Sequence, residues 1–321
     1  MTKIISLIIP IYKVEEYIID CLSSVVVQLT NDIEVILVND GTPDSSMNLA
    51  LNLIDSLPLN KKNCFKIIQQ ENQGQSVARN NALSIASGQY IAFLDSDDIL
   101  EPNYFGLLIE KIKLYYPDFI QFKSSRFMES SGPRELFHVG AKLQGLKENT
   151  FEVQKHVFNQ SAWFPWLNIY KKSLFMDSDL FPIGVYYEDA ALIPIIFLKS
   201  KNILFLSDVL YNYRYNPTGS LMNISSENID KHIKSFKYVI DLYSKKIEEQ
   251  KIFSPSLVSL TQGYISFLLK HRGVKVALSE YKKINLKNKS INISYLEKRG
   301  NIFFYRYGLI FLVFTKLIGK D

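Results

Sequence analysis

Cysteine and long apolar runs are scarce in this chain of 321 residues. Cys21 and Cys64 form no CxxC pair and belong to no His–Cys cluster, which argues against a disulfide framework and a structural zinc site. No stretch reaches the ~18 consecutive apolar residues expected of a membrane-spanning helix. The apolar run at 4–11 is too short for a secretory signal and is soon followed by acidic residues. A reducing cytoplasm is the expected location.

The chain also has only a small excess of charge of one sign. The net charge is +5, and lysine and arginine are scattered until the C-terminal third, so we expect no nucleic-acid partner. An anionic small molecule or an anionic membrane surface fits this mild excess better. Hydrophobic residues make up 47% and charged residues 21%, which excludes overall disorder and supplies ample core for one large domain or two.

Strand-like and helix-like patterns alternate over the first 125 residues. Apolar runs at 4–10, 33–38, 65–68, 90–94 and 119–122 alternate with helical patterns at 14–28, 45–57, 76–86 (closed by Gly88) and 103–116. This order predicts an α/β fold with a parallel sheet covered on both faces. The pattern becomes irregular after about residue 124, and helical patterns return at 190–198, 231–250 and 257–281.

The most informative segment is Asp95-Ser96-Asp97-Asp98, which directly follows a buried strand. Adjacent carboxylates repel one another and are rarely buried without a partner. A divalent cation that bridges them to a diphosphate would remove this conflict, because Mg²⁺ is held by one or two carboxylates plus substrate phosphates. The alternative is a surface loop that caps the next helix.

Ligands of an open parallel sheet bind beyond the carboxyl ends of its strands. Asp40 and Asp95 both fall at such ends, so we expect them on one rim facing a shared pocket, although Asp40 alone is equally explained as a turn residue. Arg79 falls in the first turns of the helix after Gly74, where a guanidinium suits an anion. The competing interpretation of Arg79 is an exposed helix arginine.

Three further charged residues lie in the irregular region. Glu188 and Asp189 follow two tyrosines, and a carboxylate in a partly desolvated pocket becomes a better general base. A first-turn acid or helix cap explains the same pair and is compatible with that role. Arg214 offers another cation, a weaker signal because most such arginines are structural or solvated.

In their order along the chain, these motifs resemble the family 2 glycosyltransferases. The resemblance covers residues 4 to about 222 and rests on Ile8-Ile9-Pro10-Ile11-Tyr12, Val38-Asn39-Asp40-Gly41, residues 74–80, residues 94–98 and Glu188-Asp189. It implies the GT-A nucleotide-diphospho-sugar transferase fold, an α/β, Rossmann-like, mixed and mainly parallel sheet with a helical C-terminal region. The nearest likeness is to bacterial enzymes that build O-antigen, capsule or other exopolysaccharides.

The resemblance also implies roles for individual residues. Those that would bind the nucleotide sugar are Pro10, Tyr12, Asp40, Arg79, Asp95, Ser96 and Arg214. Asp97, with Asp95, would hold Mn²⁺ or Mg²⁺ on the diphosphate. Asp189 would be the base that deprotonates the acceptor hydroxyl, supported by Glu188.

The activity implied is an inverting transfer that forms a β-glycosidic bond. A hexose or N-acetylhexosamine would move from a UDP-sugar to a lipid-linked saccharide acceptor in bacterial surface polysaccharide synthesis. The expected division is a catalytic domain at 1–222, with nucleotide-binding half 1–125 and acceptor half 126–222, and a helical region at 223–321.

Residues 300–321 mix aromatic and basic side chains. This composition suits a helix lying on an anionic membrane surface, here the inner face of the plasma membrane. Burial against the catalytic domain or in a homodimer interface is an equal alternative.

Two other function classes remain open on the residues alone. A nucleotidyltransferase that makes sugar nucleotides should carry a glycine-rich phosphate loop after the first strand, and Pro10-Ile11-Tyr12-Lys13 is not one. A non-catalytic sugar- or lipid-binding scaffold would not need an acidic residue at every position at which the resemblance leads us to expect one.

Overall fold

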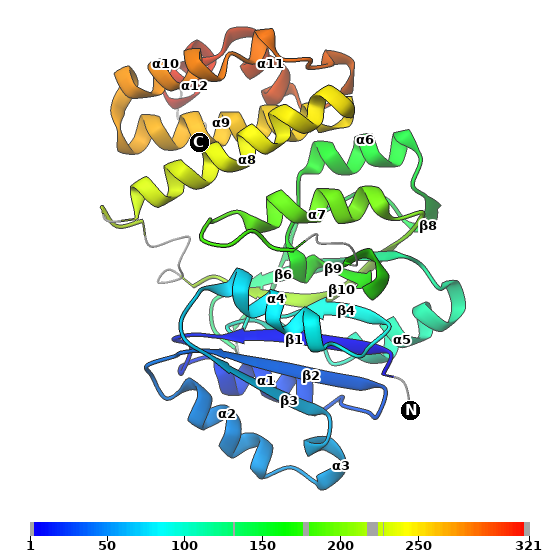
Figure 1. The fold of residues 1–321 in the computed structure, drawn as a ribbon. Helices are drawn as coiled ribbons and strands as arrows, with labels where there is room; N and C mark the ends of the chain where they lie inside the picture. The colour runs from blue at the N-terminus through cyan, green and yellow to red at the C-terminus, as the bar shows by residue number, and fades with distance from the viewer. Residues whose placement is uncertain (1–2, 131, 176–179, 217–223, 227, 318–321) are drawn as a thin grey trace. The chain divides into compact units, whose positions relative to one another are not determined.

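The computed structural model describes residues 3–130, 132–175, 180–216, 224–226 and 228–317 (Figure 1). The chain forms two compact units. The sheet unit comprises Met1–Asn149, Trp163–Gly184 and Leu192–Asn223, and the helical unit comprises Thr150–Ala162, Val185–Ala191 and Ile224–Asp321. This division differs from a single cut at 222/223, because two segments from the middle of the chain group with the C-terminal helices.

The sheet unit is built on a mixed sheet. Its strands are β1 (Ile5–Ile11), β2 (Ile33–Asp40), β3 (Phe65–Gln70), β4 (Tyr90–Phe93), β5 (Ile99–Leu100), β6 (Phe119–Phe127), β7 (Glu135–Phe137), β8 (Gly145–Glu148), β9 (Asn168–Lys171) and β10 (Asn202–Arg214). Parallel strands run in the order β3-β2-β1-β4, β9 is antiparallel to both β4 and β6, and β10 is parallel to β6. The carboxyl ends of β1, β2, β4 and β10 therefore point the same way.

Helices cover both faces of this sheet. They are α1 (Ile18–Val26), α2 (Ser46–Asp55), α3 (Leu59–Lys62), α4 (Gln75–Ile85), α5 (Tyr104–Tyr115), the short η1 (Pro165–Leu167) and η2 (Lys172–Phe175), and most of α7 (Glu188–Lys199). Helices α1 and α2 lie together on one face and α4 on the other (Figure 1), as right-handed crossovers between parallel strands require. All of β4 and nearly all of β1 is buried, which confirms the strands predicted from near-continuous apolar runs.

Two local predictions in this unit were wrong. Helix α1 begins at Ile18 rather than at 14, because residues 14–17 form a separate turn. Helix α4 ends at Ile85 and is followed by an extended Ala86, so Gly88 does not close it. Gly88 instead permits close packing, since a Cβ there would lie 2.6 Å from the backbone nitrogen of Ser6.

The helical unit contains α6 (Phe151–Gln160), the first residues of α7, α8 (Ile229–Glu249), η3 (Lys251–Phe253), α9 (Ser254–His271), α10 (Gly273–Ile284), η4 (Leu286–Asn288), η5 (Ile293–Tyr295), α11 (Arg299–Tyr307) and α12 (Leu309–Leu317). The single helix expected at 257–281 is two helices, because Gly273, the first residue of α10, adopts a left-handed φ of 81°. The tail expected to be one helix is also two, separated at Gly308; residues 318–321 lie outside the described residues.

One described segment, 251–271, is long and apolar enough to cross a membrane by length and composition alone. Of its apolar window, 61% is buried inside the protein. Leu257, Val258, Ile265 and Leu268 have no exposed surface. Such burial is typical of a helix in the core of a helical unit.

Candidate active site

Neighbouring strands of the sheet unit end at one rim. Strands β2 and β4 flank β1 in parallel, with Ile8 of β1 opposite Phe93 of β4. Strand β2 ends at Asp40, β1 ends one residue before Tyr12, and β4 ends two residues before Asp95. The strand-end residues therefore share the edge at which open parallel sheets bind ligands, as expected.

Asp40 shapes the turn that leads into α4. Its carboxylate accepts hydrogen bonds from the backbone N–H groups of Gln73 and Gly74, at 2.8 and 2.9 Å. Asp40 is thus a turn residue, and it also lies at the rim. On the neighbouring segment Tyr12 is 41% exposed and Pro10 is partly exposed, so both side chains are accessible there.

Arg79 is a buried, fixed cation beside Asp95. It is only 2% exposed, so the interpretation as an exposed helix arginine was wrong. Its guanidinium donates to Asp95 Oδ1 at 2.9 Å and lies 5.9 Å from the ring of Phe93 and 5.4 Å from that of Phe181. Because a planar guanidinium between rings and a carboxylate loses little further freedom on binding, Arg79 is pre-oriented.

The acids after β4 occupy three different environments. Asp95 is paired with Arg79, whereas Asp98 is buried and accepts a hydrogen bond from the Tyr211 hydroxyl at 2.6 Å. Asp97 is partly exposed and accepts from the Asn216 amide at 3.2 Å. Strand β5 follows the acids directly, so the interpretation of this loop as a helix cap was wrong.

The electrostatics of these acids fit a cation. Burial and the neighbouring charge of Asp95 raise the pKa of Asp97, and burial together with both neighbours raises the pKa of Asp98. Within the described ranges, no group of three histidine, cysteine or acidic side chains forms a ready-made metal site. One or two carboxylates with substrate phosphates are nevertheless the usual holders of Mg²⁺, so the residues present fit that ion.

Arg214, the last residue of β10, contacts the loop formed by residues 95–98, here called the acid loop. Its Nε donates to the backbone oxygen of Asp97 at 2.7 Å, and its terminal nitrogen lies 3.4 Å from a carboxylate oxygen of Asp20. The guanidinium lies 4.8 Å from the ring of Tyr17 and 4.5 Å from that of Phe127. Arg214 is thus nearly buried among partners from its own unit.

Glu188 and Asp189 open α7 within the helical unit. Glu188 is buried, and Asp189 is partly exposed with Oδ1 accepting from the N–H of Ala190 at 2.7 Å. This confirms the first-turn acid pair. Tyr187, just before them, has a φ of 60°, which is unusual for a residue with a side chain.

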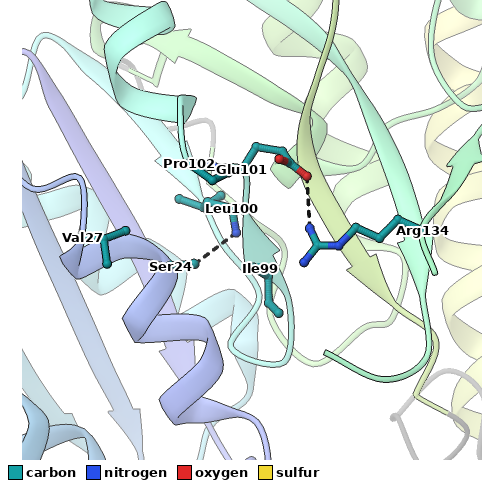
Figure 2. Close-up of a pocket in the computed structure, with 7 residues that line it drawn as sticks. All are labelled: Ser24, Val27, Ile99, Leu100, Glu101, Pro102 and Arg134. Carbon is teal, nitrogen blue, oxygen red and sulfur yellow. Dashed lines mark hydrogen bonds and ion pairs between the residues drawn. The ribbon is translucent and has the colours of Figure 1, made fainter. Parts of the chain in front are cut away.

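A cavity of about 420 Å³ opens beside the acid loop in the sheet unit (Figure 2). Its lining residues are Ser24, Val27, Ile99, Leu100, Glu101, Pro102 and Arg134. Leu100 N donates to Ser24 Oγ at 3.1 Å, and Arg134 pairs with Glu101 at 3.1 Å. No predicted site residue lines it, so the strand-end side chains rather than this cavity make up the candidate site.

Similarity to known proteins decides the family. A model of glycosyl transferase family 2 matches residues 6–164. The chain is 32% identical to the glycosyltransferase GlyA of Streptococcus pneumoniae, over 76% of this chain but only 34% of that protein's length. It is 30% identical to the uncharacterized glycosyltransferase EpsJ of Bacillus subtilis, over 76% of this chain and 71% of EpsJ. The chain belongs to glycosyltransferase family 2.

The fold agrees with this family. The crystal structure of TarS from S. aureus in complex with UDP-GlcNAc has a TM-score of 0.65 to this chain at 20% identity, covering 95% of this chain and 92% of that one. The GT-A fold expected from the sequence is therefore confirmed. The nucleotidyltransferase alternative falls away with the family assignment.

Sequence reasoning missed several residues of this candidate site. Asn216 lies two residues beyond β10, so the strand-end rule would have found it had β10 been recognised. Asp20 on α1 and Phe181, which covers Arg79, carry no sequence signal of their own. Contacts of Pro10, Tyr12, Asp40, Arg79, Asp95, Ser96 and Arg214 with a nucleotide sugar, and the base role of Asp189, stay predictions.

Proposed function

We propose that this protein is an inverting, metal-dependent glycosyltransferase that uses a UDP-sugar donor and forms a β-glycosidic bond. The observation that carries the proposal is the rim at the strand ends, where Arg79 and Asp95 are fixed beside the partly exposed Asp97. Family membership supports the reaction class, and the UDP-GlcNAc complex of TarS supports UDP as the nucleotide. The sugar moved is a hexose or an N-acetylhexosamine.

On the donor side, Asp97 and Asp95 would hold Mn²⁺ or Mg²⁺, and the ion, when bound, would neutralise the charge of the diphosphate. The guanidinium of Arg79 adds a fixed positive charge at the same rim. Pro10 and Tyr12 offer a partly exposed surface at the neighbouring strand ends for the nucleotide base, and the buried Asp40 would line it by shaping the turn beside it.

On the acceptor side, Asp189 takes the proton of the acceptor hydroxyl while the oxygen of that hydroxyl attacks the anomeric carbon of the donor sugar. The new bond joins that oxygen to the carbon while the bond from carbon to the diphosphate oxygen breaks, and UDP leaves. A single displacement assisted by one base inverts the configuration, in the manner of inverting glycoside hydrolysis. Glu188, buried beside Asp189 in the first turn, supports the base.

The acceptor is proposed to be a lipid-linked saccharide of bacterial surface polysaccharide synthesis, met at the inner face of the plasma membrane. Support comes from apolar side chains that α11 and α12 leave exposed: Phe303, Tyr307, Ile310, Val313 and Phe314. The ring of Phe303 stacks on Tyr307 and on Phe311, giving a continuous aromatic surface. Exposed apolar side chains next to basic ones suit an anionic lipid surface.

The test joins binding with turnover. Titration of UDP with Mn²⁺ measures donor-site binding, and UDP release from UDP-glucose, UDP-galactose and their N-acetyl forms measures turnover. Asp97→Ala should abolish both metal-dependent UDP binding and transfer, whereas Asp189→Asn should abolish transfer and keep UDP binding. The exposed acids Asp208 and Asp241 give matched Asp→Asn controls. Full activity of Asp189→Asn would remove this residue from the role of base.

A further inference from the structure

The segment that carries Asp189 has a backbone conformation that needs support. Tyr187 has a φ of 60°, in the left-handed region that costs a residue with a side chain roughly 1 kcal/mol or more. Such a conformation persists only when the surroundings hold it. Helix α7 begins one residue later, so the turn at Tyr187 sets the direction in which its first acids point.

Helix α8 supplies the support within the helical unit. Ser235 Oγ accepts from the backbone N–H of Tyr186 at 2.9 Å, His232 Nδ1 lies 2.9 Å from the Tyr187 hydroxyl, and the Tyr243 hydroxyl donates to the backbone oxygen of Ala190 at 2.5 Å. Because residues three or four apart share a face, these contacts follow one buried stripe of α8. Three hydrogen bonds thus tie the chain on both sides of Asp189.

His232 is not explained by packing alone. It is 1% exposed, and burial, with His271 and Lys231 nearby, lowers its pKa, so the imidazole is neutral at neutral pH. Its Nε2 has no hydrogen-bond partner in the described part of the chain, which costs about 1–3 kcal/mol for a buried polar atom. An aliphatic side chain would fill the same space without that penalty. What the histidine adds is the hydrogen bond to Tyr187.

Tyr187 in turn lies close to the acid. Its ring packs 4.5 Å from that of Phe236, and burial together with the charge of Asp189 raises the pKa of its hydroxyl. The same charge contributes to the raised pKa of the buried Tyr243. The charge of Asp189 therefore acts on two neutral hydroxyls, that of Tyr187, which α8 holds, and that of Tyr243, which α8 supplies.

We propose that α8 positions the proton acceptor of the transfer reaction, with His232 as a positioning residue that acts through Tyr187 on Asp189. This inference rests on the proposed function of Asp189 as base. It gives the C-terminal helices a role in catalysis, since His232 lies far along the chain from any glycosyltransferase motif.

The test compares variants that remove the hydrogen bond but keep the volume. His232→Leu and Tyr187→Phe should lower kcat by about 10- to 100-fold, because small displacements of a catalytic group cost that much, and should leave the UDP affinity and the donor KM unchanged. His232→Asn places an amide near the position of Nδ1 and should recover most of the rate. His271→Leu is the matched control: it removes a second imidazole of the unit, whose ring packs 4.5 Å from Phe267.

A readout independent of turnover separates this inference from the proposed function. Hydrogen exchange of residues 185–195 should accelerate in His232→Leu and not in His271→Leu. Unchanged exchange, unchanged kcat, or a parallel loss of UDP binding would each overturn the positioning role. If His232→Leu does not fold, Tyr187→Phe decides, since it keeps the ring. If the wild type releases UDP from none of the donors, the proposed function is refuted. The hydrogen-exchange measurement would still decide whether His232 and Tyr187 hold the segment that carries Asp189.

Discussion

Glu34 of β2 offers a prediction whose size follows from the structure. Its side chain is almost fully buried at the base of the sheet unit and accepts hydrogen bonds from Ser6, from Lys66 at 2.7 Å and from both the backbone and the hydroxyl of Ser87. Burial by itself would raise the pKa of Glu34, but the bonds from Lys66, Ser6 and Ser87 outweigh it and lower the pKa to about 2.

The sign and magnitude follow from linkage. The ordinary pKa of 4.5 lies above the folded value of about 2, so the unfolded chain binds the proton more readily between these pH values. The ionised side chain therefore stabilises the fold above pH 4.5, and this contribution is lost as the pH falls towards 2. A shift of about 2.5 pH units corresponds to about 3 kcal/mol, at 1.36 kcal/mol per unit.

The assay is urea unfolding of the wild type and Glu34→Gln at pH 7, 5 and 3, followed by tryptophan fluorescence. Both tryptophans, Trp163 and Trp166, are buried in the sheet unit and report its unfolding. Glu34→Gln should be less stable by about 3 kcal/mol at pH 7, and the gap should shrink below pH 4.5. Taking the difference between variants removes the titration of other carboxylates, and the exposed Glu148→Gln serves as control. A gap of equal size at pH 7 and pH 3 would refute the reasoning.

Two further predictions concern the site and the tail. Asp95→Ala removes the ion-pair partner of the buried Arg79 and should lower the free energy of unfolding by about 2 kcal/mol, measured by urea titration. Asp97→Ala should change the free energy of unfolding by less than about 1 kcal/mol. Equal effects of the two variants would contradict the view that Asp95 is the ion-pair partner of Arg79 and Asp97 is not. Replacing the exposed Ile310 and Phe314 by Asp should reduce the fraction of protein that floats with anionic vesicles about tenfold or more. Tyr238→Asp, at an exposed position on α8, is the control. Undiminished flotation of the Ile310 and Phe314 variant would argue against membrane contact through this tail.

The first 125 residues could be predicted closely because their periodicity is simple. Buried parallel strands give near-continuous apolar runs, and the observed β2, Ile33–Asp40, extends the predicted 33–38 by only two residues. The strand-end rule then placed Asp40 and Asp95 on one rim without any structural information. What the rule could not give was the environment of each side chain, such as the two rings around the guanidinium of Arg79.

The irregular region resisted prediction for identifiable reasons. Strand β10 pairs with β6 through register shifts between Phe205 and Val209 and between Val209 and Tyr211, which break the alternation expected of a strand. Strand β9 has four residues, too few for periodicity to be recognised. The bonds from α8 to residues 186–190 join positions more than 40 residues apart, and nothing local to either segment encodes them.

The burial of Asp98 shows how such distant contacts serve the site. A carboxylate that is 1% exposed beside two other acids is unfavourable, and its raised pKa reflects that penalty. Asp98 nevertheless accepts from the Tyr211 hydroxyl and from the backbone N–H of Arg214 at 2.7 Å, both on β10. These bonds fix the loop after β4 to a strand far along the chain, and Asp97 lies in the middle of that loop. The energetic penalty of burying Asp98 thus accompanies a backbone that is already held at Asp97, the proposed metal ligand. A carboxylate on such a backbone loses less freedom when it binds a ligand.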